Sequence, residues 1–361
     1  MKKTQAILLL CLWLGLTGLS WLMPPRAFSD AERRPLTQMP SFSLQSLEKG
    51  SFMSDFEAYT LDQFPLRDRF RTLKSLFHYG ILGQKDNNGI YLHEGYAAKQ
   101  EYPLKEESLA HALARFEGLR EKYLMESDIY MAIVPDKGYY LAEESGQPAM
   151  DYAALQKTFR EGMPWATHIN LTDKLSLQDY YRTDTHWQQH RILEAAKAIC
   201  GALGVTAPQA EDYRVTELEK PFYGVYYGQA ALPMEPDSIC ILENELLAEC
   251  RVFDQETGKT LPVYDLSRLD GKDPYEIYLS GPKSLLTIEN PRARTDRELI
   301  VFRDSFGSAM IPLILQDYAK VTVIDIRYIQ MDLLDRFVEF KGQDVLFLYS
   351  TLVLNNSETI K

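Results

Sequence analysis

Residues 298–310, ELIVFRDSFGSAM, decide the fold that we predict for this chain. Four consecutive apolar residues, 299–302, indicate a buried strand, and a helix is expected over 307–319. Asp304 and Ser305 lie in the turn between the two. Strand–turn–helix units build parallel sheets, whose ligand sites lie at the carboxyl ends of the strands. The stretch therefore predicts an α/β fold with Ser305 at a cleft.

The same alternation of apolar strands and helices extends outward from this stretch. Further strands are expected at 128–135, 167–175, 320–327 and 344–350, and further helices at 106–126, 188–204 and 331–340. Strands interleaved with helices indicate a mainly parallel sheet covered on both faces. Residues 210–290 interrupt the rhythm with many Tyr, Pro and Gly residues and short β-like runs, so we expect a β-rich insertion there.

The first 25 residues predict a membrane segment. Lys2 and Lys3 precede an uncharged apolar run of 18 residues, 6–23. This run is longer than the apolar region of a typical signal peptide and reaches the lower limit of a spanning helix. Because no A-x-A cleavage pattern follows, an uncleaved signal-anchor is favoured over a cleaved signal. The positive-inside rule then places the rest of the chain outside the cytoplasm, anchored to the membrane, or secreted if the segment is cleaved.

Residues 26–84 form a linker and an N-terminal helical region. Apolar residues recur at helical spacing between residues 61 and 77, and Pro65 interrupts the pattern, so we expect a break or kink there. Residues 87–99, NNGIYLHEGYAAK, indicate a hairpin. The α/β domain then takes up residues 85–361.

The composition limits the functional classes. Of the 361 residues, 45% are hydrophobic and 25% charged, which is typical of globular proteins. The net charge of −12 and the isoelectric point of about 5.1 argue against nucleic acid as a partner, which requires a basic surface. Cys200, Cys240 and Cys250 leave two alternatives open: a Cys240–Cys250 disulfide or separate buried thiols.

A second stretch, YYRTDTHWQQH (180–190), carries the other chemical candidates. Asp184 and His186 are two residues apart, so the carboxylate can orient one ring nitrogen and leave the other free. Ser305 would supply the nucleophile, since triads are defined by geometry rather than by chain order. The helix after Ser305 would also direct backbone N–H groups at an oxyanion. The alternative is that Ser305 is only a helix cap.

A metal site at the same stretch is not expected. His186 and His190 are four residues apart, but there is no H-E-x-x-H and no nearby cysteine pair. We therefore expect no metal and no cofactor, and His190 is interpreted as a residue of the following helix start. Trp187 is either a core residue or the wall of a saccharide site.

Six stretches in this order carry a family resemblance: residues 28–70, NNGIYLHEGY, IVPDK, TDTHW, FRDSFGSAMIPLI and VIDIRYI. Together they resemble the DHHW protein family, which is related to the SGNH-like O-acetyltransferases of alginate biosynthesis. TDTHW matches the D-x-H-W signature, with Thr185 where DHHW proteins usually have His. The resemblance implies a three-layer α/β/α SGNH-hydrolase-like domain with a permuted motif order, in which the Asp-x-His element precedes the serine.

The resemblance also assigns roles to residues. It implies Ser305 as nucleophile, His186 as base and Asp184 as its orienter, with the Ser305 backbone N–H as an oxyanion donor. Arg327 and Tyr328 follow a strand end and could face the cleft, although Arg327 is equally well explained as a structural ion-pair partner. Lys137 also follows a strand end and is interpreted as structural or substrate-positioning rather than catalytic.

The function expected from these features is acyl-ester chemistry on an exported or cell-envelope polysaccharide, as an O-acetyltransferase or an esterase. A membrane-bound O-acyltransferase is the expected partner, because one apolar span cannot pass acetyl groups across a membrane. The alternative is a non-catalytic envelope protein that binds glycan or organises an assembly.

Overall fold

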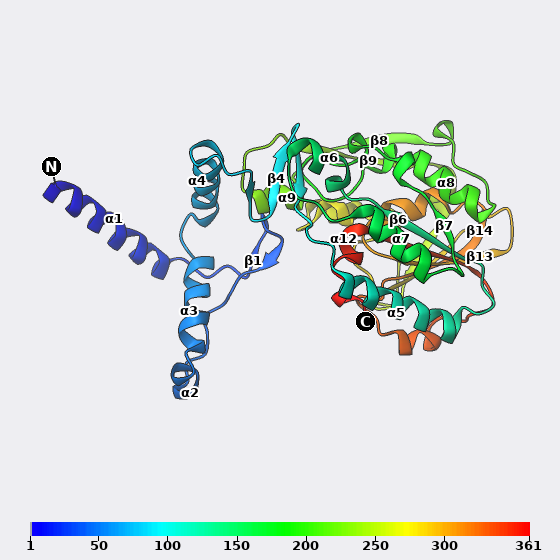
Figure 1. Cartoon of the computed structure of the whole chain (residues 1–361), viewed down its shortest axis with the longest axis horizontal. Coiled ribbons are helices and arrows are strands. Elements are labelled where there is room, and N and C mark those ends of the chain that lie inside the picture. Colours follow the sequence, from blue (N-terminus) through cyan, green and yellow to red (C-terminus); the bar gives the residue numbers. More distant parts are fainter. Residues whose placement is uncertain (1) are drawn as a thin grey trace. The chain divides into compact units, whose positions relative to one another are not determined.

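The computed structural model describes residues 2–361, which form two compact units (Figure 1). Of the described residues, the N-terminal unit contains 2–88 and Tyr227–Met234, and the main unit contains Gly89–Tyr226 and Glu235–Lys361. All residues of the predicted triad belong to the main unit.

An eight-stranded sheet forms the centre of the main unit. Its order is β11 (Lys259–Leu261), β10 (Arg251–Asp254), β12 (Leu285–Glu289), β14 (Tyr318–Ile324), β13 (Arg297–Arg303), β15 (Asp344–Ser350), β6 (Ile129–Val134) and β7 (Thr167–Ile169). The five strands from β14 to β7 are parallel, and the three others add an antiparallel edge. The predicted mainly parallel sheet is confirmed.

Helices cover both faces of this sheet because successive side chains of a strand point to opposite sides. In β13, Leu299 and Val301 lie in a core with α8 (Leu193–Leu203). Ile300 and Phe302 lie in a second core with α5 (Glu106–Tyr123) and α7 (Tyr152–Gly162). Figure 1 shows α8 and α5 on opposite sides of the strands. Each such buried apolar side chain contributes roughly 2 kcal/mol, so this three-layer packing fixes the position of β13.

The helix expected over 307–319 is much shorter than predicted. Helix α11 spans only Gly307–Met310 and passes into a 3₁₀ turn at Ile311–Leu313. The physical reason is Pro312, which lacks an N–H group and whose ring clashes with the preceding helical turn. The expected helix at 331–340 is likewise a 3₁₀ helix, Met331–Arg336.

The region 210–290 is rich in strands, as expected, but it divides between two places. Strands β8 (Arg214–Phe222) and β9 (Asp237–Glu243) form a separate antiparallel ribbon. Strands β10, β11 and β12 instead extend the main sheet. The short helix α10 (Glu245–Glu249) connects the ribbon to β10. Cys240 and Cys250 are buried free thiols.

A hairpin and two short helices flank the predicted site in the main unit. Strands β4 (Ile90–His93) and β5 (Tyr96–Lys99) form the expected hairpin. Helix α6 (Lys137–Ser145) follows β6, and α12 (Thr351–Leu354) follows β15. Both helices therefore begin at the carboxyl ends of parallel strands, the edge of the sheet where Ser305 also lies.

The N-terminal unit is mainly helical: α1 (Lys2–Leu22), α2 (Leu44–Glu48), α3 (Ser51–Asp62) and α4 (Arg67–Gly80). Its strands, β1 (Phe28–Ser29), β2 (Arg34–Pro35) and β3 (Asp86–Asn87), have two residues each. The break expected at Pro65 is confirmed, since α3 ends at Asp62 and α4 begins at Arg67. Helix α1 is long and apolar enough to cross a membrane, a test that a cleavable signal also passes.

An ion-pair network fixes the linker of this unit to its helices. Both amino groups of the Arg34 guanidinium donate to Asp62, at 2.9 and 2.6 Å, and the Thr37 backbone N–H donates to the same carboxylate at 2.9 Å. Hydrogen bonding from Arg34 holds the pKa of Asp62 well below its usual value. Next to this network lies a cavity of about 530 Å³ whose lining includes Phe64, Phe70 and Lys74 and no triad residue.

Candidate active site

Ser305 lies in a tight turn that is fixed from within by Asp304. The Asp304 carboxylate accepts the Phe306 backbone N–H at 3.0 Å and, through its other oxygen, the Ser350 backbone N–H at 2.7 Å. Asp304 is fully buried. Because Ser350 ends the neighbouring strand β15, this one side chain ties the serine turn to two strand ends.

Arg303, the last residue of β13, supports the same turn from inside the protein. Its guanidinium is fully buried, donates to the Gly281 carbonyl at 3.3 Å, and lies 3.8 Å from the Asp325 carboxylate. Burial lowers the pKa of Arg303. A Cβ added at Gly307 would lie 2.8 Å from the Arg303 Cβ, so only glycine lets the chain after Ser305 pack this closely.

The structure brings Asp184, His186 and Ser305 together in a continuous chain of hydrogen bonds. Ser305 Oγ lies 2.8 Å from His186 Nε2, and His186 Nδ1 lies 2.6 Å from Asp184 Oδ1. The Asp184 carboxylate is fully buried and also accepts the backbone N–H groups of His186, at 3.1 Å, and Val225, at 2.8 Å. With Nδ1–H donating to Asp184, Nε2 is left to accept the Ser305 hydroxyl proton.

Aromatic rings hold the imidazole in place. Tyr275 stacks on His186 with a centroid distance of 3.8 Å and an interplanar angle of 7°, and Phe306 packs at 5.1 Å. Trp187 is fully buried, and its indole N–H donates to the Phe306 carbonyl at 3.1 Å. The saccharide-wall interpretation of Trp187 is therefore wrong in this structure, because its ring has no exposed face, and the core interpretation holds.

The Asp184 turn belongs to no long helix or strand and depends on close contacts with other loops. The Gly224 backbone packs directly against Asp184, and a Cβ at position 224 would overlap both the backbone and the side chain of Asp184. Asp237 accepts the backbone N–H groups of Arg182, at 2.9 Å, and Thr183, at 2.8 Å. The turn is therefore held by individual polar contacts.

Lys137 holds the other side of this turn. Its ammonium is buried and donates to the carbonyls of Tyr181, at 2.9 Å, and Arg182, at 3.2 Å. It also lies 5.0 Å from the centre of the Tyr226 ring. Burial lowers the pKa of Lys137 to about 7. The structure thus places Lys137 against the backbone before Asp184.

Arg327 and Tyr328 follow β14, the strand beside β13, at the same edge of the sheet. The Arg327 guanidinium makes two hydrogen bonds to the buried Asp325 carboxylate, at 2.9 and 2.7 Å. Its guanidinium is thus engaged in an ion pair, which agrees with the interpretation of Arg327 as a structural ion-pair partner. Tyr328 is 50% exposed, and its ring centre lies 5.5 Å from the Arg327 guanidinium carbon.

The backbone around Ser305 narrows the choice of oxyanion donor. The N–H of Phe306 donates to Asp304 Oδ1 and that of Gly307 to the Asp304 carbonyl. The expectation that the following helix supplies several free N–H groups is therefore wrong, since α11 has four residues and its first donors are occupied. Within the described part of the chain, the Ser305 N–H has no hydrogen-bond acceptor.

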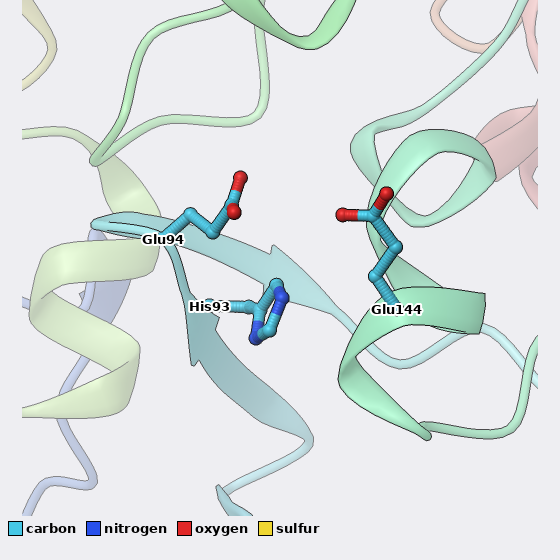
Figure 2. A group of neighbouring side chains, drawn as sticks. All are labelled: His93, Glu94 and Glu144. Carbon is cyan, nitrogen blue, oxygen red and sulfur yellow. The ribbon is translucent and has the colours of Figure 1, made fainter.

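Metal-binding potential lies elsewhere in the main unit. His93, Glu94 and Glu144 have donor atoms within 4.8 Å of one another, and Figure 2 shows the two carboxylates facing each other with the His93 ring beside them. Imidazole and carboxylate donors suit a zinc ion. His190 lies in a 3₁₀ helix, Gln189–Arg191, outside this group, and burial lowers its pKa.

Several residues that hold the site are not among the residues predicted from the sequence to act there: Arg303, Asp304, Gly224, Asp237 and Tyr275. Asp304 had a recognisable position, directly before the serine in a strand-to-helix turn. Gly224, Asp237 and Tyr275 had no such signal, because they come from the β-rich region and reach the site only through the tertiary fold.

Solved structures share this fold. A DHHW family protein from Eubacterium siraeum is 20% identical, with a TM-score of 0.62, and the match covers 76% of this chain and 95% of that one. PatB1 from Bacillus cereus is 18% identical, with a TM-score of 0.62 and coverage of 75% and 98%. PatB1 is also known with a sulfonyl adduct, a structure that matches with a TM-score of 0.59.

A weaker match, to the O-acetyltransferase domain of Pseudomonas putida AlgJ, has 16% identity and a TM-score of 0.46, covering 74% of this chain and 92% of that one. A comparison with the sequences of curated proteins finds no significant match. The family model described as DHHW protein matches residues 172–324. That range contains Asp184, His186 and Ser305, so the resemblance of this chain to the DHHW family is confirmed over the stretch that carries the hydrogen-bonded residues.

Proposed function

We propose that this protein is a serine-dependent O-acyltransferase or esterase that moves acetyl groups on a polysaccharide outside the cytoplasm. The observation that carries the proposal is the hydrogen-bond chain from Asp184 through His186 to Ser305, with distances of 2.6 and 2.8 Å. Such a chain is the arrangement that activates a hydroxyl nucleophile. The DHHW match and the fold shared with PatB1 support it.

The first half of the reaction forms an acyl-enzyme. Ser305 Oγ attacks the acyl carbonyl carbon while its proton passes to His186 Nε2, and Asp184 stabilises the imidazolium through Nδ1–H. The carbonyl electrons move onto oxygen, and the free Ser305 N–H is the proposed donor to that oxyanion. Collapse of the intermediate expels the donor alkoxide, which takes the proton from His186 and leaves an ester on Ser305.

The second half transfers the acyl group to an acceptor. A sugar hydroxyl gives its proton to His186 and attacks the ester, which restores the Ser305 hydroxyl and releases the acetylated sugar. If water is the acceptor, the product is acetate and the protein acts as an esterase. Tyr328 and the Arg327 side chain are proposed to contact substrate, since they follow β14 beside the serine turn, and Lys137 is proposed to position the Asp184 turn.

The proposed location and partner rest on the N-terminal helix. If α1 anchors the chain, the main unit acts at the outer membrane face, and a membrane-bound O-acyltransferase is the proposed source of acetyl groups. The apolar window Lys3–Ser20 has a mean hydropathy of 1.3 and supports this arrangement.

The test is covalent labelling with a sulfonyl fluoride, combined with hydrolysis of p-nitrophenyl acetate. The reagent should modify Ser305, identified by peptide mass spectrometry, and Ser305→Ala should lose both labelling and hydrolysis. Ser308→Ala, which removes a neighbouring serine hydroxyl, should retain both. Labelling at another residue, or full activity in Ser305→Ala, would remove Ser305 from the mechanism.

Acceptor choice is measured separately. With p-nitrophenyl acetate as donor and a deacetylated oligosaccharide present, a transferase gives an acetylated sugar that mass spectrometry detects, whereas an esterase gives acetate alone. A non-catalytic glycan-binding protein would bind the oligosaccharide equally well before and after the Ser305→Ala change and would turn over neither substrate.

A further inference from the structure

The outer face of α4 carries an apolar stripe that the described residues of its unit leave largely exposed, with the Phe64 ring in contact only at Phe70. Leu66, Phe70, Leu73, Phe77 and Ile81 follow one another at steps of four and three residues, which keeps them on one side of the helix. Their exposed fractions are 53, 44, 62, 46 and 72%. A continuous apolar surface of this kind marks a contact with a partner or a membrane.

The opposite face of α4 already has its partners within the N-terminal unit. Ser75 is buried, donates to the Ala230 carbonyl at 3.0 Å, and accepts the Asn87 amide at 2.7 Å. Arg71 donates to the Gly228 carbonyl at 2.9 Å. These contacts fix the rotation of α4 about its axis. The stripe therefore faces away from the rest of the N-terminal unit.

Two cations border the stripe. At about 100° per residue, Arg69 lies about 40° to one side of Leu73 and Lys74 about 100° to the other. Both side chains are exposed, and within the described part of the chain neither has a carboxylate at ion-pair distance. An apolar stripe edged by unpaired basic side chains is the pattern of a helix that lies in a lipid interface, because the long stems reach past the apolar layer to the phosphates.

The charge of the chain is divided in the same way. Residues 1–88 contain eleven Lys and Arg against eight Asp and Glu, a net charge of +3. The rest of the chain has a net charge of −15, which gives the total of −12. The same segment contains the apolar helix α1. A basic segment next to an apolar span favours an anionic lipid surface, while the acidic remainder is repelled from it.

A second copy of the chain fits the stripe less well. A symmetric dimer across this face would bring two Arg69 and two Lys74 side chains together without acidic partners, and like charges in contact are unfavourable. Lipid phosphates supply the missing negative charge. The cavity of about 530 Å³ beside α4, which includes Phe70 and Lys74 in its lining, also leaves room for a headgroup.

We propose that the outer face of α4 lies in the interface of an anionic lipid bilayer, with the stripe against acyl chains and Arg69 and Lys74 against lipid phosphates. This contact holds the folded chain at the membrane surface through a second site besides α1. It does not depend on the triad, and its test uses no enzymatic readout.

The experiment measures the depth of a spin label in the full chain reconstituted into lipid nanodiscs. A label at Leu73→Cys, in a Cys11→Ser background whose remaining cysteines are buried, should collide more often with oxygen than with a water-soluble nickel complex. A label at Lys157→Cys, on the exposed surface of α7, serves as the water control and should show the reverse.

Lipid composition and charge variants complete the test. The label at position 73 should lie deeper in nanodiscs containing phosphatidylglycerol than in phosphatidylcholine alone, and Arg69→Gln with Lys74→Gln should remove that difference. Water-like accessibility at position 73 would overturn the proposal. Shielding from both reagents would also overturn it, because it would mean that protein covers the stripe.

Discussion

The two turns that meet at the candidate active site are held by different physical means. The turn at Ser305 grows out of the central strand β13 and is tied by Asp304 to the end of β15. The turn at Asp184 has no sheet beneath it and is held by the Val225 N–H, Lys137 and Asp237. The nucleophile is thus positioned by the ends of two core strands, and the base by polar contacts from distant loops together with the aromatic rings that pack on it.

Because of this difference, we expect substitutions behind the two turns to affect different properties of the protein. Changes behind Ser305 disturb the ends of two packed strands and should lower the stability of the whole unit. Changes behind His186 disturb a local arrangement and should lower activity more than stability. The following predictions test this contrast, from the largest expected effect to the smallest.

The largest effect is expected for His186→Gln. Activity toward p-nitrophenyl acetate should fall roughly 10⁴-fold, because the variant keeps a polar side chain but loses the base that accepts the Ser305 proton. Unfolding in denaturant should change less than activity, since glutamine is similar in size to histidine and keeps a polar group between Asp184 and Ser305. A loss of less than about tenfold would mean that His186 is not the base.

Asp304→Ala tests the turn held by the core. The variant leaves the buried N–H groups of Phe306 and Ser350 without acceptors, and each costs about 1–3 kcal/mol. The free energy of unfolding should therefore fall by about 3 kcal/mol, measured by denaturant titration. Asp296→Ala, an exposed carboxylate just before β13, is the control and should stay near the parent value. Equal stability of the two variants would show that Asp304 does not stabilise the serine turn.

Gly224→Ala tests the turn held by loops. The new methyl group would overlap Asp184, so the Asp184 turn must move away from Ser305. A displacement of about 1 Å can cost roughly 10²-fold in rate, and we expect that loss in kcat/KM with a smaller change in stability. The control is Gly201→Ala in α8, where a methyl group meets no atom within 4 Å and should leave activity unchanged. A Gly224→Ala enzyme with parental activity would show that the turn tolerates movement.

The last prediction concerns the pH dependence of stability through Lys137. Its pKa is lowered from 10.5 to about 7 in the folded chain, so between these values the unfolded chain binds more protons and stability rises with pH. Below about pH 7 both states carry the charge and the contribution is constant. Between pH 7 and about pH 9.5, the unfolding free energy of the parent should therefore rise relative to that of Lys137→Met. If the unfolding free energies of the two proteins change in parallel with pH, the pKa of Lys137 is not lowered in the folded chain.

Much of this arrangement could be predicted from residue patterns. The alternation of apolar strands and helices predicts the parallel sheet, and Ser305 after ELIVFR is placed correctly because strand ends share one edge of such a sheet. The helix after Ser305 was overestimated, since the apolar pattern of 307–319 hides the effect of Pro312. The β-rich region could be recognised, but not the way in which β10, β11 and β12 extend the sheet, because strand partners are long-range contacts.

By itself, the sequence determined the local elements, the apolar anchor candidate and the pairing of Asp184 with His186, because each depends on neighbours within a few residues. Only the tertiary structure decided that Ser305 lies 2.8 Å from His186, although 119 residues separate them, and that Trp187 is core. It also decided that Gly224 and Lys137 fix the Asp184 turn and that the apolar stripe of α4 stays largely exposed. These facts depend on how distant segments pack, and packing is a property of the whole chain and not of any local pattern.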